Sequence, residues 1–272
     1  MIELEVRLGE RSYPIRIGPW RDWDLRSLTR GWARAPWALV VDRRAWDVWS
    51  RDILSCLGAS EIDVRVLEIE GGEGAKGHQA VFRIYDHLMA SGIRRDGTLA
   101  AFGGGVVGDI AGFAAATWMR GIRFVQIPTT LLAQVDASVG GKTGLNYGQG
   151  RALSGKNLIG AFHQPGAVLI SPEWLTSLGT REFSAGLAEV VKCGIIRDLE
   201  LLELLEAESP SRLPTSPALE QILARALVVK ARIVEQDEHD HDLRHLLNFG
   251  HTVGHAVEAA TGFSRLLHGE AV

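Results

Sequence analysis

A glycine cluster stands between the apolar run Thr98–Phe102 and a helix-like segment that begins at Asp109. A strand, a glycine turn and a helix start leave backbone N–H groups unpaired at the positive end of the helix dipole, which suits a phosphate or pyrophosphate. Gly103, Gly105 and Gly108 fit the spacing G-x-G-x-x-G, and glycine lets an anion approach the backbone. The cluster predicts a nucleotide site. The alternative is that these glycines only allow tight strand–helix packing.

A Rossmann fingerprint also places an acidic residue at the end of the next strand, where it holds the ribose. The next strand here, Ile122–Ile127, is followed by Pro-Thr-Thr and has no carboxylate at its end. An earlier strand, Trp37–Asp42, does end in one, so the ribose partner is expected on the preceding part of the sheet. A second glycine cluster precedes Lys142 but lacks the G-x-x-x-x-G-K-[ST] spacing of a P-loop. Lys142 is therefore a candidate for a substrate phosphate or carboxylate.

Composition excludes several classes of protein. The chain has 272 residues, 46% of them hydrophobic, which favours two domains in a soluble protein. No apolar run approaches the roughly eighteen residues of a membrane span, and the first residues do not have the pattern of an export signal. The net charge of −4 is spread along the chain, so neither nucleic acid nor an anionic membrane is an expected partner. Cys56 and Cys193 are far apart and indicate a reducing compartment, which we take to be the cytoplasm.

Periodicity predicts two kinds of architecture along the chain. Alternation in Ile2–Ile17 predicts a hairpin. Alternating strands and helices then indicate an α/β domain, residues 1–177, with a mostly parallel, Rossmann-like sheet. Helical periods alone follow, and they indicate an all-α domain over residues 178–272. The predicted strands are 38–42, 62–69, 98–102, 124–127 and 167–170, the helices are 45–57, 78–91, 109–119, 181–197, 199–207, 216–234 and about 243–260, and a loop is expected over 147–155.

Histidines and a glutamate in the helical part suggest a metal site. His251 and His255 are one helical turn apart and share a face, as a pair of ligands would. Glu189 lies three residues before Lys192 on an apolar helix, where an acid and a base need each other or a polar site. Two imidazoles and one carboxylate with an open position make a catalytic zinc set, and His268 is a further candidate. Spacing alone does not select which two imidazoles bind. The glutamate of H-E-x-x-H is absent, which argues against a zincin protease.

Taken together, the chain resembles the 3-dehydroquinate synthase family of sugar phosphate cyclases. The matching blocks are GGGVVGDIAGFAAATWMRG, IPTTLLAQVDASVGGKTGLN, GKNLIGAFHQP, REFSAGLAEVVK, LNFGHTVGHAVEAATG and HGEAV, and their order and distances agree from about Val40 onward. The resemblance implies NAD, one divalent metal (zinc or cobalt), a sugar phosphate substrate and a homodimer. It implies metal ligands at Glu189, His251 and His268.

The resemblance also implies the other site residues. Those expected to bind NAD are Asp42, Glu73, Lys76, Gly105, Val106, Val107, Gly108, Asp109, Thr129, Thr130, Lys142, Lys156, Trp174, Leu175, Thr176 and Ser177. Those expected to contact the substrate are Asp136, Lys142, Asn157, Lys192, Lys230, Arg244, Asn248 and His255, with Arg120 reaching across the dimer interface.

The implied reaction converts a seven-carbon keto-acid sugar phosphate, 3-deoxy-D-arabino-heptulosonate 7-phosphate, into 3-dehydroquinate and phosphate, the second step of the shikimate pathway. A transient oxidation by NAD precedes phosphate elimination, re-reduction and ring closure, so NAD is regenerated. Another sugar phosphate cyclase is a close alternative. A metal-dependent alcohol dehydrogenase fits less well, because a simple alcohol needs no cationic pocket such as Lys192, Lys230 and Arg244. The remaining alternative is a catalytically silent NAD-binding fragment.

The chain departs from the family pattern at four places. The loop at 147–155 is longer than usual, Asp240 stands where the family usually has a glutamate, and Cys193 replaces a tyrosine. The sequence also ends soon after His268, where the family continues with more helices, so we expect either a fragment of a longer chain or a reduced form.

Overall fold

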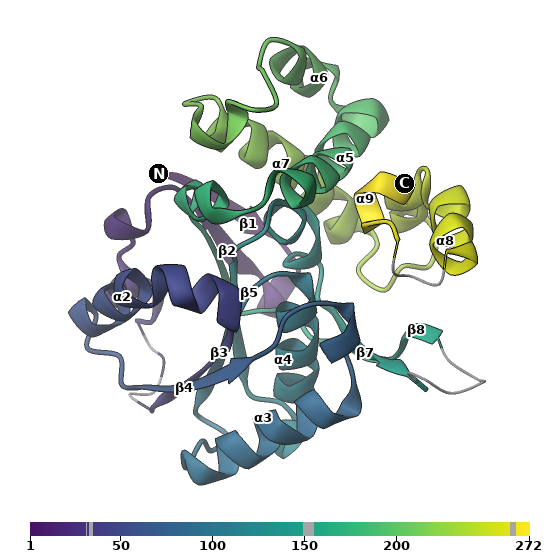
Figure 1. The fold of residues 1–272 in the computed structure, drawn as a ribbon. Coiled ribbons are helices and arrows are strands. Elements are labelled where there is room, and N and C mark those ends of the chain that lie inside the picture. Colours follow the sequence, from purple (N-terminus) through teal and green to yellow (C-terminus); the bar gives the residue numbers. More distant parts are fainter. Residues whose placement is uncertain (31, 33–34, 149–154, 262–264) are drawn as a thin grey trace.

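The fold is described from a computed structural model, which describes residues 1–30, 32, 35–148, 155–261 and 265–272 (Figure 1). Its centre is a seven-stranded sheet with the strand order β1-β2-β9-β6-β5-β3-β4. The hairpin of β1 and β2 is antiparallel, and the other neighbours in the sheet pair in parallel. The strands are β1 (Ile2–Val6), β2 (Tyr13–Ile17), β3 (Trp37–Asp42), β4 (Val64–Ile69), β5 (Thr98–Gly103), β6 (Arg123–Pro128) and β9 (Ala167–Ile170).

Helices cover both faces of the parallel part. Leu39 and Val41 of β3 pack in one cluster with residues of α2 (Arg43–Ala59), whereas Ala38 and Val40 pack in another with α3 (His78–Ala90) and α4 (Gly105–Thr117). Successive side chains of a strand point to opposite faces, so a strand buried on both faces reads as a continuous apolar run. The predicted α/β sheet is therefore confirmed. The short helix α1 (Leu25–Leu28) precedes it.

The strand order reverses between β3 and β5, which creates a crevice at their carboxyl ends. From β3 the chain passes through α2 to β4 on one side, and then returns through α3 to β5 on the other side of β3. Val41 pairs with Phe102, so Asp42 lies next to Gly103. Ligands of open α/β sheets bind at such a reversal point. The acidic strand end and the glycine cluster thus meet there, as expected.

The C-terminal part is helical and packs on the hairpin edge of the sheet (Figure 1). Val6, Tyr13 and Ile15 of the hairpin share one hydrophobic cluster with Phe183 and Leu227 of the helices. The helices are α5 (Thr180–Arg197), α6 (Leu199–Glu206), α7 (Leu219–Gln236), α8 (His251–Ala260) and α9 (His268–Ala271). No helix among the described residues has the length and apolar character that a membrane crossing requires.

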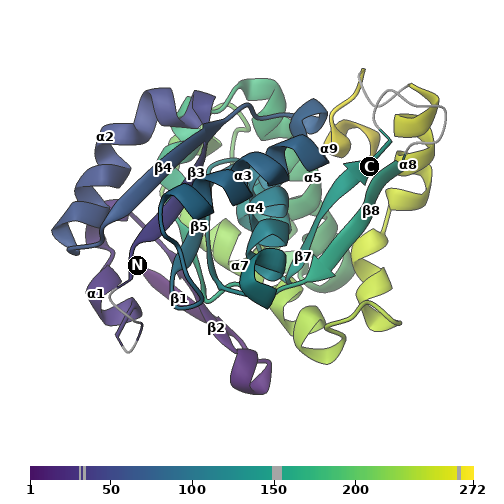
Figure 2. The same cartoon turned by 90° about the horizontal axis from the view of Figure 1, so that it is seen from below.

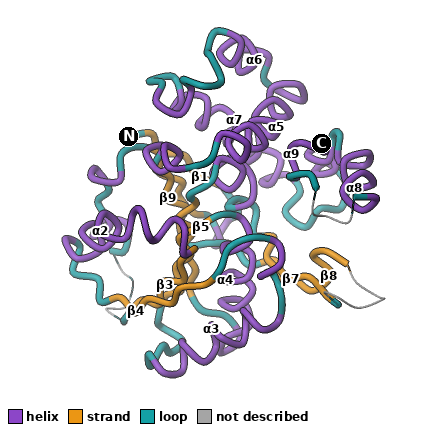
Figure 3. Tube along the Cα trace, in the orientation of Figure 1, coloured by secondary structure: helices purple, strands orange, loops and turns teal. Residues whose placement is uncertain are grey.

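A two-stranded antiparallel ribbon, β7 (Lys142–Tyr147) and β8 (Gly155–Phe162), stands apart from the main sheet (Figure 3). Periodicity did not predict it, and the second glycine cluster runs directly into β7. Figure 2 shows the ribbon between α4 and the C-terminal helices. A Cβ added to Gly112 of α4 would lie 2.5 Å from Thr143, so the glycine allows the ribbon to approach. Most of the loop predicted at 147–155 lies outside the described residues.

Two predicted helices differ most from those in the structure. The helix after the first glycine cluster begins at Gly105 rather than Asp109, so Gly104 alone separates β5 from α4. The helix predicted over about 243–260 is interrupted, because a 3-10 helix over Leu243–Asn248 ends before α8 begins. Gly250 separates the two with φ +80°, a backbone conformation that favours glycine and stops a helix.

Candidate active site

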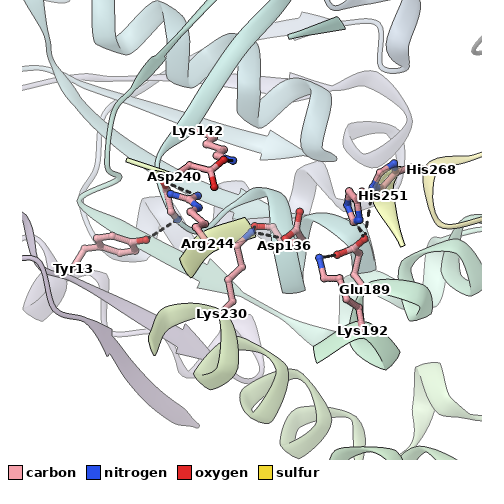
Figure 4. A network of polar contacts seen from close by, with 11 residues as sticks. Tyr13, Asp136, Lys142, Glu189, Lys192, Lys230, Asp240, Arg244, His251 and His268 are labelled. Carbon is pink, nitrogen blue, oxygen red and sulfur yellow. Dashed lines mark hydrogen bonds and ion pairs between the residues drawn. The ribbon is translucent and has the colours of Figure 1, made fainter. Parts of the chain in front are cut away.

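Three side chains with metal-binding atoms meet where α5, α8 and α9 come together. Glu189 lies on α5, His251 is the first residue of α8, and His268 is the first of α9. The Nε2 atoms of both imidazoles lie 3.6 Å from Oε1 of Glu189 and 3.2 Å from each other (Figure 4). The structure thus brings together the three residues that the resemblance implied, although they are far apart in the sequence.

Close packing of α5 places Glu189 in this cluster. A Cβ added to Gly186 would lie 2.7 Å from the Cβ of Leu131, so glycine is needed where α5 meets the segment after β6. One turn later, Glu189 is only 1% exposed. A carboxylate at such depth requires compensating charge.

The donor atoms of the cluster fit a divalent metal ion. Oε1 of Glu189 is buried and has no hydrogen-bond partner among the described residues, which is costly for a carboxylate oxygen without a cation. Nδ1 of His251 lies 3.1 Å from the carbonyl oxygen of Phe249, so a hydrogen on Nδ1 would leave the Nε2 lone pair for a metal. Burial lowers the pKa of His251, which favours the neutral ligand form. The three donors match a catalytic zinc site with a position left open.

Two buried ammonium groups lie beside the donors. Lys192, on the same helix as Glu189, contacts its other oxygen, Oε2. Lys230 of α7 donates to the carboxylate and to the carbonyl oxygen of Asp136, both at 2.5 Å. Burial would raise the pKa of Asp136, but Lys230 and Lys192 together hold that pKa below its usual value. The result is a group of buried cations next to the metal-binding atoms.

Arg244 lies on the far side of Lys230 in the same network (Figure 4). Its buried guanidinium donates to the carbonyl oxygens of Glu238 at 2.7 Å and Gly140 at 3.0 Å. Burial also lowers its pKa. Lys142 forms an ion pair with Asp240, so the shorter acid at position 240 still reaches a lysine directly.

The first glycine cluster borders a cavity of about 390 Å³ at the β3–β5 crevice. Asp42, Gly105, Thr129 and Thr130 line it. The carboxyl ends of the strands and the N-terminus of α4 meet here, where backbone N–H groups suit a pyrophosphate. A Cβ on Gly108 would instead lie 2.7 Å from the side chain of Gln126, so close packing alone explains why glycine stands at position 108. Both explanations of the cluster therefore apply, at different glycines.

A second cavity, of about 490 Å³, lies between α4 and the ribbon, with Asp109, Lys142 and Asn157 in its lining. Lys76 donates at 2.5 Å to Asp109 and at 2.5 Å to the side-chain oxygen of Asn157. Burial raises the pKa of Asp109 to about 6, although Lys76 acts in the opposite direction. Hydrogen bonds therefore join Lys76 and Asp109, which are predicted to bind NAD, to Asn157, which is predicted to contact the substrate.

Comparison with known proteins identifies the family. Residues 66–185 match the family model described as 3-dehydroquinate synthase N-terminal, and residues 186–272 match 3-dehydroquinate synthase C-terminal. The chain belongs to the 3-dehydroquinate synthase family. The 3-dehydroquinate synthases of Pelobacter propionicus and Acaryochloris marina are 47% identical over 275 residues and 45% identical over 282. These matches cover 100% and 99% of this chain but 75% and 73% of the relatives, so it spans about three quarters of their length.

Solved structures agree with this family. The 2-epi-5-epi-valiolone synthase ValA from Streptomyces hygroscopicus, with NAD+ and Zn2+ bound, has a TM-score of 0.86 and 32% identity over 97% of this chain and 72% of that chain. A 2-deoxy-scyllo-inosose synthase complexed with carbaglucose-6-phosphate, NAD+ and Co2+ has a TM-score of 0.83 and 25% identity, covering 99% and 73%. An iron-containing alcohol dehydrogenase, at 14% identity, TM-score 0.64 and coverage of 95% and 74%, shares the fold alone.

The remaining residues expected to bind NAD in a member of the 3-dehydroquinate synthase family lie in different surroundings. Val106, Val107 and Ser177 line the same cavity as Gly105, whereas Thr176 lines a different one. The side chains of Trp174 and Leu175 lie in the hydrophobic core, so a nucleotide could meet only the backbone of these two residues. Glu73 accepts a hydrogen bond from Asn146 at 2.7 Å, and Lys156 pairs with Glu258 at 3.2 Å.

Three further residues expected to contact the substrate, Asn248, His255 and Arg120, are exposed, as are Lys142 and Asn157. Asn248 lies on the 3-10 helix before α8, and the ring of His255 lies 5.3 Å from that of His251. Arg120 follows the C-terminal end of α4, a helix of 13 residues, and is therefore about 20 Å from Gly105. Arg120 has φ +67°. Within one chain it does not join the cluster, so its role across an interface stays a prediction.

Sequence reasoning assigned no role to two residues of the site. Glu258 is 3% exposed and lies between Lys156 and His268. Its position seven residues after His251, two helical turns along α8, was a usable signal. Tyr13, on β2, hydrogen-bonds Gly140, and nothing in the alternating hairpin pattern distinguishes it.

Proposed function

We propose that this chain is a 3-dehydroquinate synthase, a carbon–oxygen lyase that converts 3-deoxy-D-arabino-heptulosonate 7-phosphate to 3-dehydroquinate and phosphate. It would use NAD and one divalent metal, zinc or cobalt. The observation that carries the proposal is the placement of three converging metal donors beside the buried ammonium groups of Lys192 and Lys230. The curated relatives named above support the same reaction.

Glu189, His251 and His268 would hold the metal, and the crevice from Asp42 to Gly105 would hold NAD. When bound, these groups supply Lewis acidity and reversible hydride transfer. Because the nucleotide is restored in each cycle, no net NADH is released.

The buried cations near the metal-binding atoms match the two anionic groups of the substrate, its phosphate and its carboxylate. Lys192 and Lys230 are 4% and 5% exposed, and each forms an ion pair, with Glu189 and Asp136 respectively. A phosphate or carboxylate entering the pocket would take charge-assisted hydrogen bonds from the same ammonium groups. Arg244 offers a planar guanidinium for bidentate binding of one anionic group. A simple alcohol has no anionic group to bind these cations, so a cyclase is favoured over an alcohol dehydrogenase.

Asp136 and Lys230 form the pair best placed to move a proton near the substrate. Burial lowers the pKa of Lys230, although Asp136 opposes that shift. An ammonium group destabilised in this way transfers its proton more readily to a leaving phosphate. The depth of the pocket would also protect reactive intermediates from water.

We further propose the organisation around this site. Residues 1–177 would form the NAD-binding domain and residues 178–272 the helical domain with the metal and substrate ligands. The active form would be a cytoplasmic homodimer in which Arg120 enters the partner's pocket. The exposed position of Arg120 beyond the end of α4 supports this arrangement.

The test is release of inorganic phosphate from 3-deoxy-D-arabino-heptulosonate 7-phosphate by this chain, with catalytic NAD and added zinc or cobalt, while absorbance in the NADH band is followed. Phosphate release without net NADH is expected. Glucose 6-phosphate, which has no carboxylate, is the matched control and should release none. Net NADH formation, or equal phosphate release from both compounds, would reject the assignment in favour of a dehydrogenase or another cyclase.

A further inference from the structure

Glu258 is a buried carboxylate that bridges the ribbon and the metal-binding cluster. It lies on α8 and is 3% exposed. One carboxylate oxygen accepts a hydrogen bond from Nζ of Lys156 on β8 at 3.2 Å. The other faces Nδ1 of His268 at 3.5 Å, on the ring edge opposite to the Nε2 that faces Glu189. Thus His268 lies between two carboxylates, one at each nitrogen.

Each of the three metal-binding side chains has one partner outside the cluster. His251 faces the carbonyl oxygen of Phe249 through Nδ1. Glu189 meets Lys192 through the oxygen that points away from the imidazoles. For His268, the partner outside the cluster is Glu258, which faces Nδ1. We propose that Glu258 is a positioning residue of the metal centre, which holds the His268 ring so that Nε2 is aimed at the ion; this rests on the metal centre proposed above.

The need for such a partner follows from how His268 is held. It begins α9, a helix of four residues. The backbone of that helix is fixed, because a Cβ on Gly269 would lie 1.8 Å from the carbonyl oxygen of Ala185, and because Arg181 binds both oxygens of Glu270. These contacts do not orient the imidazole. A carboxylate at Nδ1 fixes both the tautomer and the rotation of a ligating ring, and it raises the basicity of the other nitrogen.

A different explanation is that Glu258 itself binds a second ion together with His255 and His268, since their donor atoms also lie within 4.8 Å of one another. The ammonium group of Lys156 argues against it, because it already compensates the Glu258 carboxylate and would repel a cation. His268 would also have to bind one ion through each nitrogen. One ion, with Glu258 in an orienting role, satisfies all the contacts.

The test measures metal binding directly, so its result does not depend on turnover. Zinc affinity of the full chain is measured by competition with a chromogenic chelator, and cobalt binding by its visible absorption spectrum. Glu258→Gln is expected to weaken zinc binding by about 10–100-fold and to change the cobalt spectrum, while one ion per chain still binds. Glu206→Gln, the same substitution at an exposed position on α6, is the matched control and should leave both unchanged.

A double-mutant cycle shows whether Glu258 acts through His268. In a His268→Ala background, Glu258→Gln should have no further effect on zinc affinity. An equal loss in both backgrounds would overturn the proposal, as would unchanged affinity in the single variant. Binding of two ions per chain, with one lost in Glu258→Gln, would identify Glu258 as a ligand instead. If zinc and Glu258 behave as expected but no phosphate is released from the heptulosonate, the proposed reaction fails and this inference stands.

Discussion

The phenol oxygen of Tyr13 accepts a hydrogen bond from the backbone N–H of Gly140 at 3.1 Å, across 127 residues of sequence. Gly140 has φ +96°, and its carbonyl oxygen accepts a hydrogen bond from Arg244. Burial raises the pKa of Tyr13, so the phenol stays protonated. Strand β2 therefore supports the loop that holds both Arg244 and the start of β7.

Replacing Tyr13 with phenylalanine should weaken the site and the fold together. The Gly140 N–H would lose its buried acceptor, at a cost of about 1–3 kcal/mol in the free energy of unfolding. Because Arg244 rests on the same glycine, KM for the substrate should rise more than kcat falls. Urea denaturation and steady-state phosphate release measure the two effects. Tyr85→Phe, which removes a hydroxyl bonded to Thr117 near the surface, is the control. Equal effects of the two variants would mean that Tyr13 only fills space.

Gly269→Ala should displace His268 and impair metal binding. Its Cβ would lie 1.8 Å from the carbonyl oxygen of Ala185, which is backbone and cannot move aside as a flexible side chain would. Helix α9 must therefore shift away from α5. Zinc affinity should fall at least about tenfold, or ~1.4 kcal/mol. Gly58→Ala, on α2 with nothing within 4 Å of the added methyl group, should leave zinc affinity unchanged. Retention of tight zinc binding in Gly269→Ala would show that α9 does not position the ligand.

Local sequence patterns sufficed for the main sheet. Strands β3, β5 and β9 are apolar runs, because both of their faces are buried, and glycine or polar residues mark their ends. The ribbon was not predicted, because its strands lack alternation. β8 is largely exposed, and β7 contains Gly144, whose Cβ would lie 2.6 Å from the carbonyl oxygen of Ile159. What fixes the ribbon is close backbone contact, which a single sequence does not reveal.

The site was only partly predictable for a similar reason. Helical spacing placed His251 and His255 on one face but could not choose between them, and His268 was selected only through the family resemblance. The structure separates the two: His251 is buried against Glu189, whereas His255 is exposed. Glu258 and Tyr13 act through contacts that join distant segments. Such partners become evident only when the helices are packed.

Gly105→Val should weaken NAD binding. Gly105 is the first residue of α4 and lines the cavity at the strand ends, with an added Cβ only 3.1 Å from Ala137. A branched side chain there would hold a pyrophosphate away from the helix N-terminus. Calorimetric titration with NAD should show affinity reduced by tenfold or more, about 1.4 kcal/mol, with zinc affinity retained. Gly58→Val is the control for the same substitution in a helix. Unchanged NAD affinity in Gly105→Val would place the nucleotide elsewhere.

The free energy of unfolding should depend on pH because of Asp109. Its pKa is raised from 3.8 to about 6, chiefly by burial, with Lys76 opposing. Between these two values the folded protein binds more protons than the unfolded chain, so the contribution of Asp109 to stability falls as pH rises. The destabilisation that results from burying the ionised Asp109 carboxylate is absent below about pH 4 and complete above about pH 6. A shift of about two pKa units corresponds to at most about 3 kcal/mol.

Asp109→Asn isolates this effect, because asparagine has nearly the same shape and does not titrate. The variant cannot form the ion pair with Lys76, whose ammonium group still donates to Asn157. The pKa of about 6 for Asp109 already includes the effect of that pair. The free energy of unfolding of the variant minus that of the parent should therefore increase by about 2–3 kcal/mol between pH 4 and pH 7, when measured by denaturant titration. A difference that stays flat would mean that Asp109 titrates alike in the folded and unfolded chain. A difference that decreases would mean that the pair with Lys76 outweighs burial, and that the folded protein lowers the pKa of Asp109 instead of raising it.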